Sequence, residues 1–390
     1  VFRAHKEKAV VVLGSATPSL ETRTNADKGR YQSLMLHKRV HKRPLPEVTT
    51  INLAEEERIG DGIFTEPMVT AMEQTLANDE QIILFQNRRG FAPYVSCRDC
   101  GHAFRCDSCD VSLTLHRRRE ILQCHYCGFE TQAQDECPSC GGHRVGSFGV
   151  GTERIETELN RILPTVPIQR LDRDQIRNRR DLEKALAQFR AGESKILVGT
   201  QMVTKGHDFP GVTLVGVISA DASLNFPDFR AAERTFQLLT QVAGRAGRAE
   251  KEGRVLVQTF ETDHYAITCA AKHDFESFIK QELVYREELF YPPFAYLCLL
   301  RFESEDEQKA MKLAQEQAEK LRNAARKMDV ELLILGPALA PLSRIKGIYR
   351  IQLLLKGATR NDIRKVLGAL SNRPQSGVRQ ILDVDPISML

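Results

Sequence analysis

The sequence predicts an α/β protein: a mostly parallel sheet with helices on both faces, a cysteine-rich insertion and a C-terminal α+β domain. Three observations predict this class. Short apolar runs alternate with helical patterns, eight of the ten cysteines fall in one short segment, and the last part of the chain has its own order of strands and helices. With 390 residues and 42% hydrophobic content, the chain can bury two or three cores, so several domains are expected.

The parallel sheet is predicted from apolar runs that have the length of buried strands. Between two of them, residues 181–189 have the spacing of an amphipathic helix, because Leu182, Leu186 and Phe189 recur at i, i+4 and i+7. Alternation of such strands and helices is typical of a parallel sheet. The apolar runs are residues 10–13, 81–85, 195–198, 212–218 and 255–260.

Three interruptions predict the domain boundaries. Residues 38–46 are basic and contain Pro44 and Pro46, which oppose regular structure and indicate a linker. The cysteine segment then replaces the apolar periodicity, and the Tyr-Pro-Pro at residues 291–293 ends a helix that begins near His273. The predicted parts are 1–43 (end of a first lobe and linker), 44–95 with 147–272 (second lobe), 96–146 (insertion) and 273–390 (connecting helix and C-terminal domain).

The C-terminal domain is predicted to have a ferredoxin-like β-α-β-β-α-β order. Its strands are expected to bury an apolar core against the two helices. The predicted elements are a strand at 297–303, a helix at 306–328, strands at 331–335 and 348–356, a helix at 359–370 and a strand at 379–384.

The cysteine-rich segment contains four C-x-x-C pairs, which indicate two closed tetrahedral zinc sites with structural roles. The same ligands allow sequential, interleaved and nested pairing, and we favour the nested one because the inner pairs flank a segment of hairpin length. His102, His125 and His143 lie close by and could compete as ligands. The nested sets are Cys97, Cys100, Cys137 and Cys140 for the first zinc, and Cys106, Cys109, Cys124 and Cys127 for the second.

Composition restricts the class of protein only broadly. A formal net charge of +4 suits contact with a polyanion but also suits many enzymes. No apolar run is long enough to span a bilayer, and residues 1–9 lack the apolar core of a signal peptide, so a cytoplasmic protein is expected. Cys269 and Cys298 have no C-x-x-C partner and are expected to be small buried apolar residues.

Three segments resemble motifs of superfamily 2 helicases. Residues 14–19, Gly-Ser-Ala-Thr-Pro-Ser, follow the apolar run at 10–13 and resemble the S-A-T motif. Residues 199–210 resemble motif V, and residues 241–248, with the pattern Q-x-x-G-R-x-G-R, resemble motif VI. The resemblance assigns nucleotide binding or coupling to Gly14, Ser15, Ala16, Thr17, Gly206 and Asp208, and DNA binding to Thr200, Gln201 and Lys205.

Motif VI has a direct chemical reading. Phosphoryl transfer builds negative charge on the γ-phosphate oxygens, and a guanidinium can donate bidentate hydrogen bonds to them. Arg245 and Arg248 are therefore candidate arginine fingers, with Gln241 as a third catalytic candidate. A spacing of three places the two arginines on one face of a helix. The alternative is a surface helix with two solvated arginines.

Further basic or glycine-containing segments could contact nucleic acid. Arg88 and Arg89 follow the run at 81–85 and could hold a phosphate backbone. Thr152 begins a helical pattern where amides could receive a DNA phosphate, or where it could simply be an N-cap. Residues 116–119, His-Arg-Arg-Arg, fit either a phosphate contact or a solvated hairpin.

The cysteine insertion between residues 87–90 and 149–152, inside a motor lobe, makes the chain similar to the PriA family, also called primosomal protein N′. This resemblance covers essentially the whole chain. It implies a RecA-like second helicase lobe in an ATP- and Mg²⁺-dependent 3′-to-5′ DNA helicase that recognises stalled or branched forks and starts primosome assembly for replication restart. It also implies a nucleoid-associated monomer whose partners are branched and single-stranded DNA, single-stranded-DNA-binding protein, PriB and DnaT.

The chain departs from the family at one essential point. No G-x-x-x-x-G-K-[ST] and no D-E-x-H follows a strand, so the lysine and the acid that hold the phosphates and Mg²⁺ are absent. We therefore expect a fragment that does not hydrolyse ATP by itself. The alternatives are a different superfamily 2 translocase and a non-catalytic zinc-bearing scaffold for DNA or proteins.

Overall fold

The computed structural model describes residues 2–36, 45–87, 94–116, 119–147, 150–172, 175–176, 178–200, 209–247, 252–370 and 377–389. The chain forms two compact units, Val1–Arg43 and Pro44–Leu390. The predicted domain boundaries inside the second unit stay predictions. None of the helices in the described part of the chain combines the length and the apolar content needed to cross a bilayer.

The first unit contains helices α1 (Phe2–Lys6) and α2 (Leu20–Asp27). Ser19 caps α2 by accepting a hydrogen bond from the Thr22 amide at 3.2 Å. The predicted strand at residues 10–13 is wrong, because this segment is irregular and Val10 is 91% exposed. An apolar run becomes a strand only beside another strand, and the described residues of this unit offer it none.

A parallel sheet forms the lobe of the second unit, as predicted. Its strands in the described residues have the order β1-β13-β12-β4-β11-β10, and β4, β11 and β12 are buried throughout. Strands of this kind need helices on both faces. Their bounds are β1 (Glu47–Asn52), β4 (Gln81–Phe85), β10 (Ile168–Leu171), β11 (Ile196–Gly199), β12 (Val212–Val217) and β13 (Arg254–Thr259).

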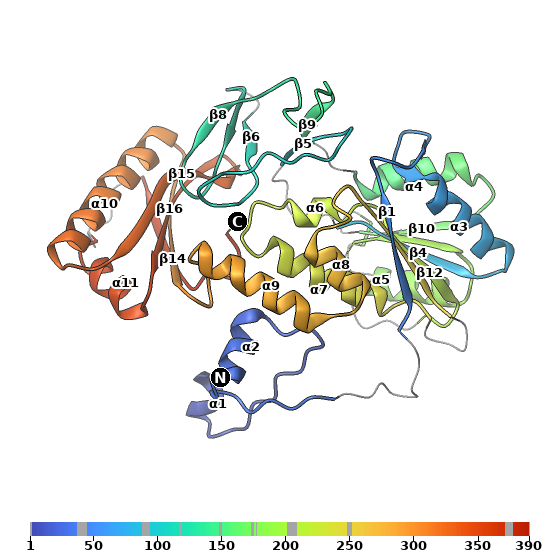
Figure 1. The fold of residues 1–390 in the computed structure, drawn as a ribbon, viewed down its shortest axis with the longest axis horizontal. Helices are drawn as coiled ribbons and strands as arrows, with labels where there is room; N and C mark the ends of the chain where they lie inside the picture. The colour runs from blue at the N-terminus through green and yellow to red at the C-terminus, as the bar shows by residue number, and fades with distance from the viewer. Residues whose placement is uncertain are drawn as a thin grey trace. The chain divides into compact units, whose positions relative to one another are not determined.

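Helices cover both faces of this sheet. Apolar side chains of α3 (Glu66–Ala77) and α4 (Thr152–Ile162) form one core with β4, β11 and β12. Helices α7 (Ala231–Ala243) and α8 (Tyr265–Ala271) lie on the other side of the sheet (Figure 1). The remaining elements of the lobe are α5 (Arg179–Arg190), α6 (Asp221–Leu224) and the short pair β2 (Arg58–Ile59) and β3 (Phe64–Thr65).

The C-terminal domain confirms the ferredoxin-like prediction. Its strands form an antiparallel sheet of order β15-β16-β14-β17, and α10 and α11 pack on one face over a shared apolar core. Strand β15 is longer than predicted because it continues through a register shift after Leu335. The bounds are β14 (Tyr296–Ser304), α10 (Glu307–Lys327), β15 (Leu332–Ile345), β16 (Ile348–Gly357), α11 (Arg360–Leu367) and β17 (Arg379–Val384), and α9 (Phe275–Glu288) precedes the domain.

The cysteine-rich insertion consists of short strands held between the lobe and the C-terminal domain. Its buried residues include zinc-ligand candidates and share one apolar cluster with Tyr291, Leu299 and Leu354 of the following segments. Gly101, at a φ of 80°, packs its Cα directly against the Phe260 side chain of the lobe. The strands are β5 (Val95–Cys97), β6 (Thr114–His116), β7 (Ile121–Gln123), β8 (Glu130–Gln132) and β9 (Val145–Ser147).

The contact between Gly101 and Phe260 can be tested with a matched glycine. Gly192→Ala at a φ of 81° meets open space, so we expect only the strain of a left-handed residue, about 1–2 kcal/mol. Gly101→Ala adds overpacking against Phe260 and should cost about 1–3 kcal/mol more, measured by urea unfolding of the chain. Equal losses of stability would show that the insertion does not depend on this contact.

Candidate functional site

Two groups of four cysteines form the best-defined site in the described residues. Each group brings all its sulfur atoms within 4.8 Å of one another. The Sγ–Sγ distances are 3.7 Å for Cys97–Cys140, 3.6 Å for Cys100–Cys137 and 3.6 Å for Cys106–Cys127. A tetrahedral ion with Zn–S bonds of about 2.3 Å places its sulfurs about 3.8 Å apart, whereas a disulfide needs about 2.05 Å. The groups are those of the nested pairing, and they fit zinc.

Tight turns aim each C-x-x-C pair at its site. In three turns the N–H of the glycine after the pair donates to the carbonyl of the first cysteine: Gly101 to Cys97 at 3.0 Å, Gly128 to Cys124 at 3.0 Å and Gly141 to Cys137 at 2.9 Å. All three glycines have positive φ, a conformation that glycine adopts readily and that suits a turn wrapping a metal. The fourth turn uses Asp110 at a φ of 48°, and its N–H donates to the Cys106 carbonyl at 2.8 Å.

Backbone amides also point at the sulfurs. The N–H groups of Asp99, Tyr126 and Phe129 donate to Cys97, Cys124 and Cys127, each at 3.4 Å. Such donors stabilise thiolates, which are the form that binds metal. Neither group includes a histidine, and the ring of His125 instead contacts the Leu339 carbonyl at 2.6 Å through Nδ1. Four sulfurs per site leave no open position for a reacting molecule, so the arrangement suits a structural role.

Motif VI lies at the end of α7. Gln241 is exposed in the last turn of the helix, which ends at Ala243 with Gly244 as C-cap. The prediction that Arg245 lies on a helix is wrong: its N–H donates to the Val242 carbonyl at 2.9 Å in the turn beyond the helix. The cause is local, because glycine disfavours a helix and Gly247 has a φ of 65°. Arg248 lies outside the described residues.

Several other predicted residues also lie outside the described part of the chain. They include the charged members of motif V and the arginines after β4. Thr200 is described and lies half-buried just beyond β11, and Ser15 in the first unit accepts a hydrogen bond from the Thr17 amide at 3.1 Å. The residues outside the description are Arg88, Arg89, Arg117, Arg118, Gln201, Lys205, Gly206, Asp208 and Arg248.

Thr152 has a structural contact. It is the first residue of α4, with Gly151 as the N-cap, so the interpretation of Thr152 as the cap residue is wrong. Its side chain is fully buried and its hydroxyl donates to Asp172 Oδ2 at 2.6 Å. The hydroxyl proton is used in this bond, and the DNA contact predicted for the amides at the start of this helix stays a prediction.

Asp221 is a buried acid that sequence reasoning missed. It follows β12 and accepts hydrogen bonds from the Thr259 hydroxyl and the Phe260 amide, each at 3.0 Å. Burial raises the pKa of Asp221 to about 6, above its ordinary value near 4. Asp221 is the first residue of α6, so these bonds tie the start of α6 to the end of β13. A single acid after a strand has no periodic pattern, so no feature of the sequence distinguishes it from a surface residue.

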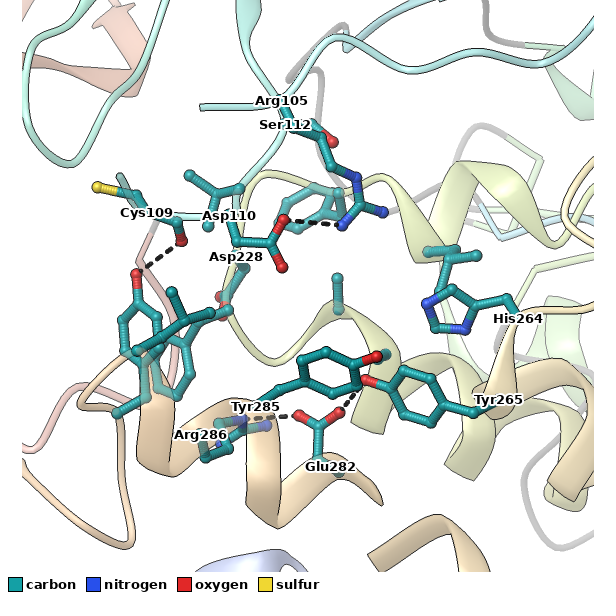
Figure 2. A pocket seen from close by; sticks show the side chains of 18 of the residues that line it. Arg105, Cys109, Asp110, Ser112, Asp228, His264, Tyr265, Glu282, Tyr285 and Arg286 are labelled. Carbon is teal, nitrogen blue, oxygen red and sulfur yellow. Dashed lines mark hydrogen bonds and ion pairs between the residues drawn. The ribbon is translucent and has the colours of Figure 1, made fainter. Parts of the chain in front are cut away.

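A pocket of about 380 Å³ lies between the insertion, α9 and the segment before α7 (Figure 2). Its polar groups largely bind one another. Glu282 accepts from the Tyr265 hydroxyl at 2.5 Å and from Arg286 at 2.6 Å, and Arg105 lies 3.5 Å from Asp110. The walls are therefore joined by internal contacts, and we assign the pocket no ligand.

Comparison with known families identifies the same segments. The model of the primosomal protein N C-terminal domain matches residues 287–387, and that of the helicase conserved C-terminal domain matches residues 141–250. The model of the PriA DNA helicase Cys-rich region matches residues 106–131, which contain the second cysteine group. Replication restart protein PriA of Bacillus subtilis is 42% identical to the chain over 396 residues, which are 100% of this chain and 49% of that protein. The chain belongs to the PriA family.

Other relatives agree with this placement. PriA of Haemophilus influenzae is 38% identical over 389 residues, covering 99% of this chain and 53% of that protein. The chain thus corresponds to the C-terminal portion of PriA and spans about half the length of the curated relatives it matches. Among solved structures, S. cerevisiae Dbp5 bound to RNA and ADP BeF3 aligns with 73% of this chain and 56% of its own, at 14% identity and a TM-score of 0.35.

Metal analysis tests the two cysteine groups. Cys124→Ser removes one ligand of the second group, so zinc content should fall from two ions per chain to one. The control is Cys269→Ala, because Cys269 is a buried cysteine outside both groups and should keep two ions. Chelation of both ions should unfold the insertion, since structural zinc contributes on the order of 10 kcal/mol in small modules. A folded wild-type chain without zinc would contradict the assignment.

Proposed function

We propose that this chain supplies the second motor lobe, two structural zinc ions and the C-terminal domain of an ATP-dependent 3′-to-5′ DNA helicase for replication restart. The observation that carries the proposal is the position of the cysteine module in the chain. A tetracysteine module is inserted between β4 and α4 of a parallel lobe whose α7 ends in motif VI. The similarity to replication restart proteins over the whole chain supports it.

The side chains of motif VI would stabilise the negative charge that develops during ATP hydrolysis. ATP, bound with Mg²⁺ in the complete protein, supplies a γ-phosphoryl group that water can accept. Arg245 lies in a turn after α7, and its guanidinium would donate hydrogen bonds to the oxygens that become more negative during transfer. Gln241, one turn earlier and exposed, would hydrogen-bond in the same region. Arg248 completes the motif in the sequence. We propose that the phosphate-binding lysine and the magnesium-binding acid come from parts of the protein outside this chain, so the chain alone does not turn over ATP.

The same proposal covers the nucleic acid and the partners. Branched and single-stranded DNA is the proposed substrate, recognised as a stalled fork. Single-stranded-DNA-binding protein, PriB and DnaT are the proposed partners in primosome assembly, and the bacterial nucleoid is the proposed location. Family membership supports these points, and we propose the 3′-to-5′ direction from the same resemblance.

DNA-stimulated ATP hydrolysis by the full-length protein tests the motor assignment. Arg245→Ala should lower kcat by about 1,000-fold or more, because an arginine finger stabilises charge in the transition state. DNA binding should persist, and Arg190→Ala, which removes an exposed arginine at the end of α5, should leave kcat unchanged. Full activity of Arg245→Ala would remove this residue from the mechanism, and a wild-type protein that binds forks without hydrolysing ATP would favour the non-catalytic scaffold.

A further inference from the structure

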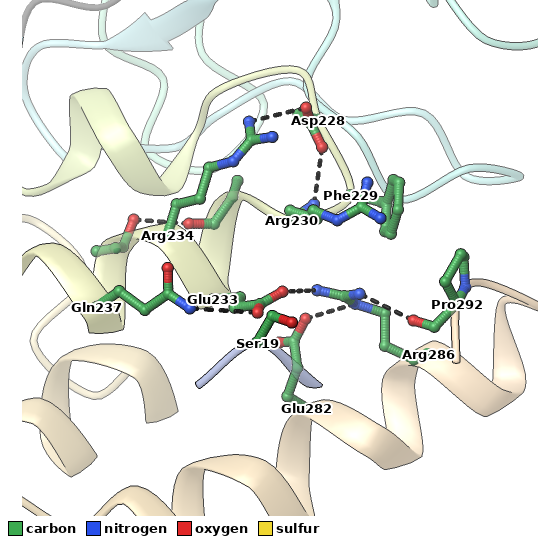
Figure 3. Close-up of polar contacts among 12 residues, drawn as sticks. Ser19, Asp228, Phe229, Arg230, Glu233, Arg234, Gln237, Glu282, Arg286 and Pro292 are labelled. Carbon is green, nitrogen blue, oxygen red and sulfur yellow. Dashed lines mark hydrogen bonds and ion pairs between the residues drawn. The ribbon is translucent and has the colours of Figure 1, made fainter. Parts of the chain in front are cut away.

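A buried arginine joins the first turns of α7 to α9. Arg286 of α9 has a side chain that is only 2% exposed, and its three nitrogens donate in three directions (Figure 3). Nη2 donates to Glu233 of α7 at 3.0 Å, Nε donates to Glu282 of α9 at 2.6 Å, and Nη1 donates to the Pro292 carbonyl at 3.0 Å. Both glutamates are buried as well, at 4% and 3% exposure.

The main effect of this cluster is to fix the orientation of α7 relative to α9, and its contribution to stability is small. A buried ion pair contributes little net stability compared with apolar packing, because removing the charges from water costs about as much as their attraction returns. The planar guanidinium of Arg286, however, donates hydrogen bonds only in fixed directions. Arg286 therefore holds Glu233, and with it the N-terminal half of α7, in one orientation relative to α9.

The junction continues into the insertion and the C-terminal domain. The Arg286 guanidinium lies 4.8 Å from the Phe229 ring, which stacks on Tyr291 with centroids 4.5 Å apart and an angle of 4°. The Tyr291 hydroxyl donates to the Cys109 carbonyl at 3.1 Å, next to a zinc-ligand sulfur. Lys356 of β16 places its ammonium 3.5 Å from the centre of the Tyr291 ring. Tyr291 thus contacts the lobe, the insertion and the C-terminal domain.

The C-terminal residues bind the same turns of α7. Arg230 donates to the Pro386 carbonyl at 3.1 Å, and Arg234 donates to the Ile387 carbonyl at 2.6 Å. Arg234 also pairs with the buried Asp228 at 2.8 Å. The start of α7 is consequently held by α9, by the end of the chain and, through Phe229, by the insertion.

The other end of α7 carries motif VI. Its 13 residues form a rod about 20 Å long that ends two residues before Arg245. We infer that Arg286, through Glu233, is a positioning residue for ATP hydrolysis: it sets the orientation of α7 and so the place of Arg245. Because the start of α7 also contacts the insertion and the C-terminal residues, the position of Arg245 depends on both. This inference rests on the proposed function.

The test separates positioning from stability in the full-length protein. The triple variant Glu233→Gln, Glu282→Gln, Arg286→Met removes all three charges together, which avoids an unpaired buried charge. We expect a melting temperature near that of the wild type, kcat of DNA-stimulated ATPase at least about tenfold lower, and KM for ATP within about twofold, because only the transition-state contact is lost. The control is Arg179→Met with Glu183→Gln, an exposed i,i+4 pair on α5 of the same lobe, which should change neither constant.

A second comparison keeps the inference open to refutation if the triple variant folds poorly. Arg286→Lys keeps the charge but loses the directional bonds, and it should lower kcat in the wild-type background but not further in Arg245→Ala, because it acts through Arg245. Unchanged kcat in a folded triple variant, or an equal further loss in Arg245→Ala, would overturn the positioning role. A wild-type protein without ATPase activity would instead overturn the proposed function.

Discussion

The burial of the Arg286 guanidinium is the constraint on which the second unit depends most. A charge at 2% exposure is tolerable only if it is paired and hydrogen-bonded, and here each nitrogen has an acceptor, on α9, on α7 or in the loop at Pro292. The packing of Phe229 beneath the guanidinium then brings in Tyr291. Because each partner lies on a different segment, satisfying one side chain determines how these segments meet.

In the insertion, metal binding compensates for a small apolar core. Its strands are only three residues long, so four thiolates per site add to the apolar packing that the insertion shares with neighbouring segments. The module is not isolated, however. Tyr126 accepts a hydrogen bond from the Phe229 amide at 3.2 Å, and Gln352 of β16 donates to the His125 carbonyl at 2.8 Å. The insertion therefore stabilises, and is stabilised by, both the parallel-sheet lobe and the C-terminal domain.

The parts of this molecule that could be predicted from sequence are those with a local pattern. Strands buried on both faces read as apolar runs, and β4 was predicted with its observed bounds, whereas the edge strands β1 and β10 were missed because their residues are half-exposed and mixed. C-x-x-C spacing predicted the eight ligands, and the hairpin-length segment between the inner pairs favoured the nested grouping that the structure shows. The run at residues 10–13 failed because an apolar sequence does not reveal whether a neighbouring strand exists. Asp221 and the pair Glu233–Arg286 depend on contacts between distant segments, which spacing along one chain does not record.

These features combine into one account, in which the arginine at the end of α7 is tied through its helix to the zinc module and the C-terminal domain. Hydrogen exchange of the full-length protein, with and without a non-hydrolysable ATP analogue, tests this most directly. The account predicts that the analogue changes amide protection at residues 241–247 and also at residues 228–234 and 286–291, where the junction lies. A change confined to residues 241–247, with the junction unaffected, would contradict it.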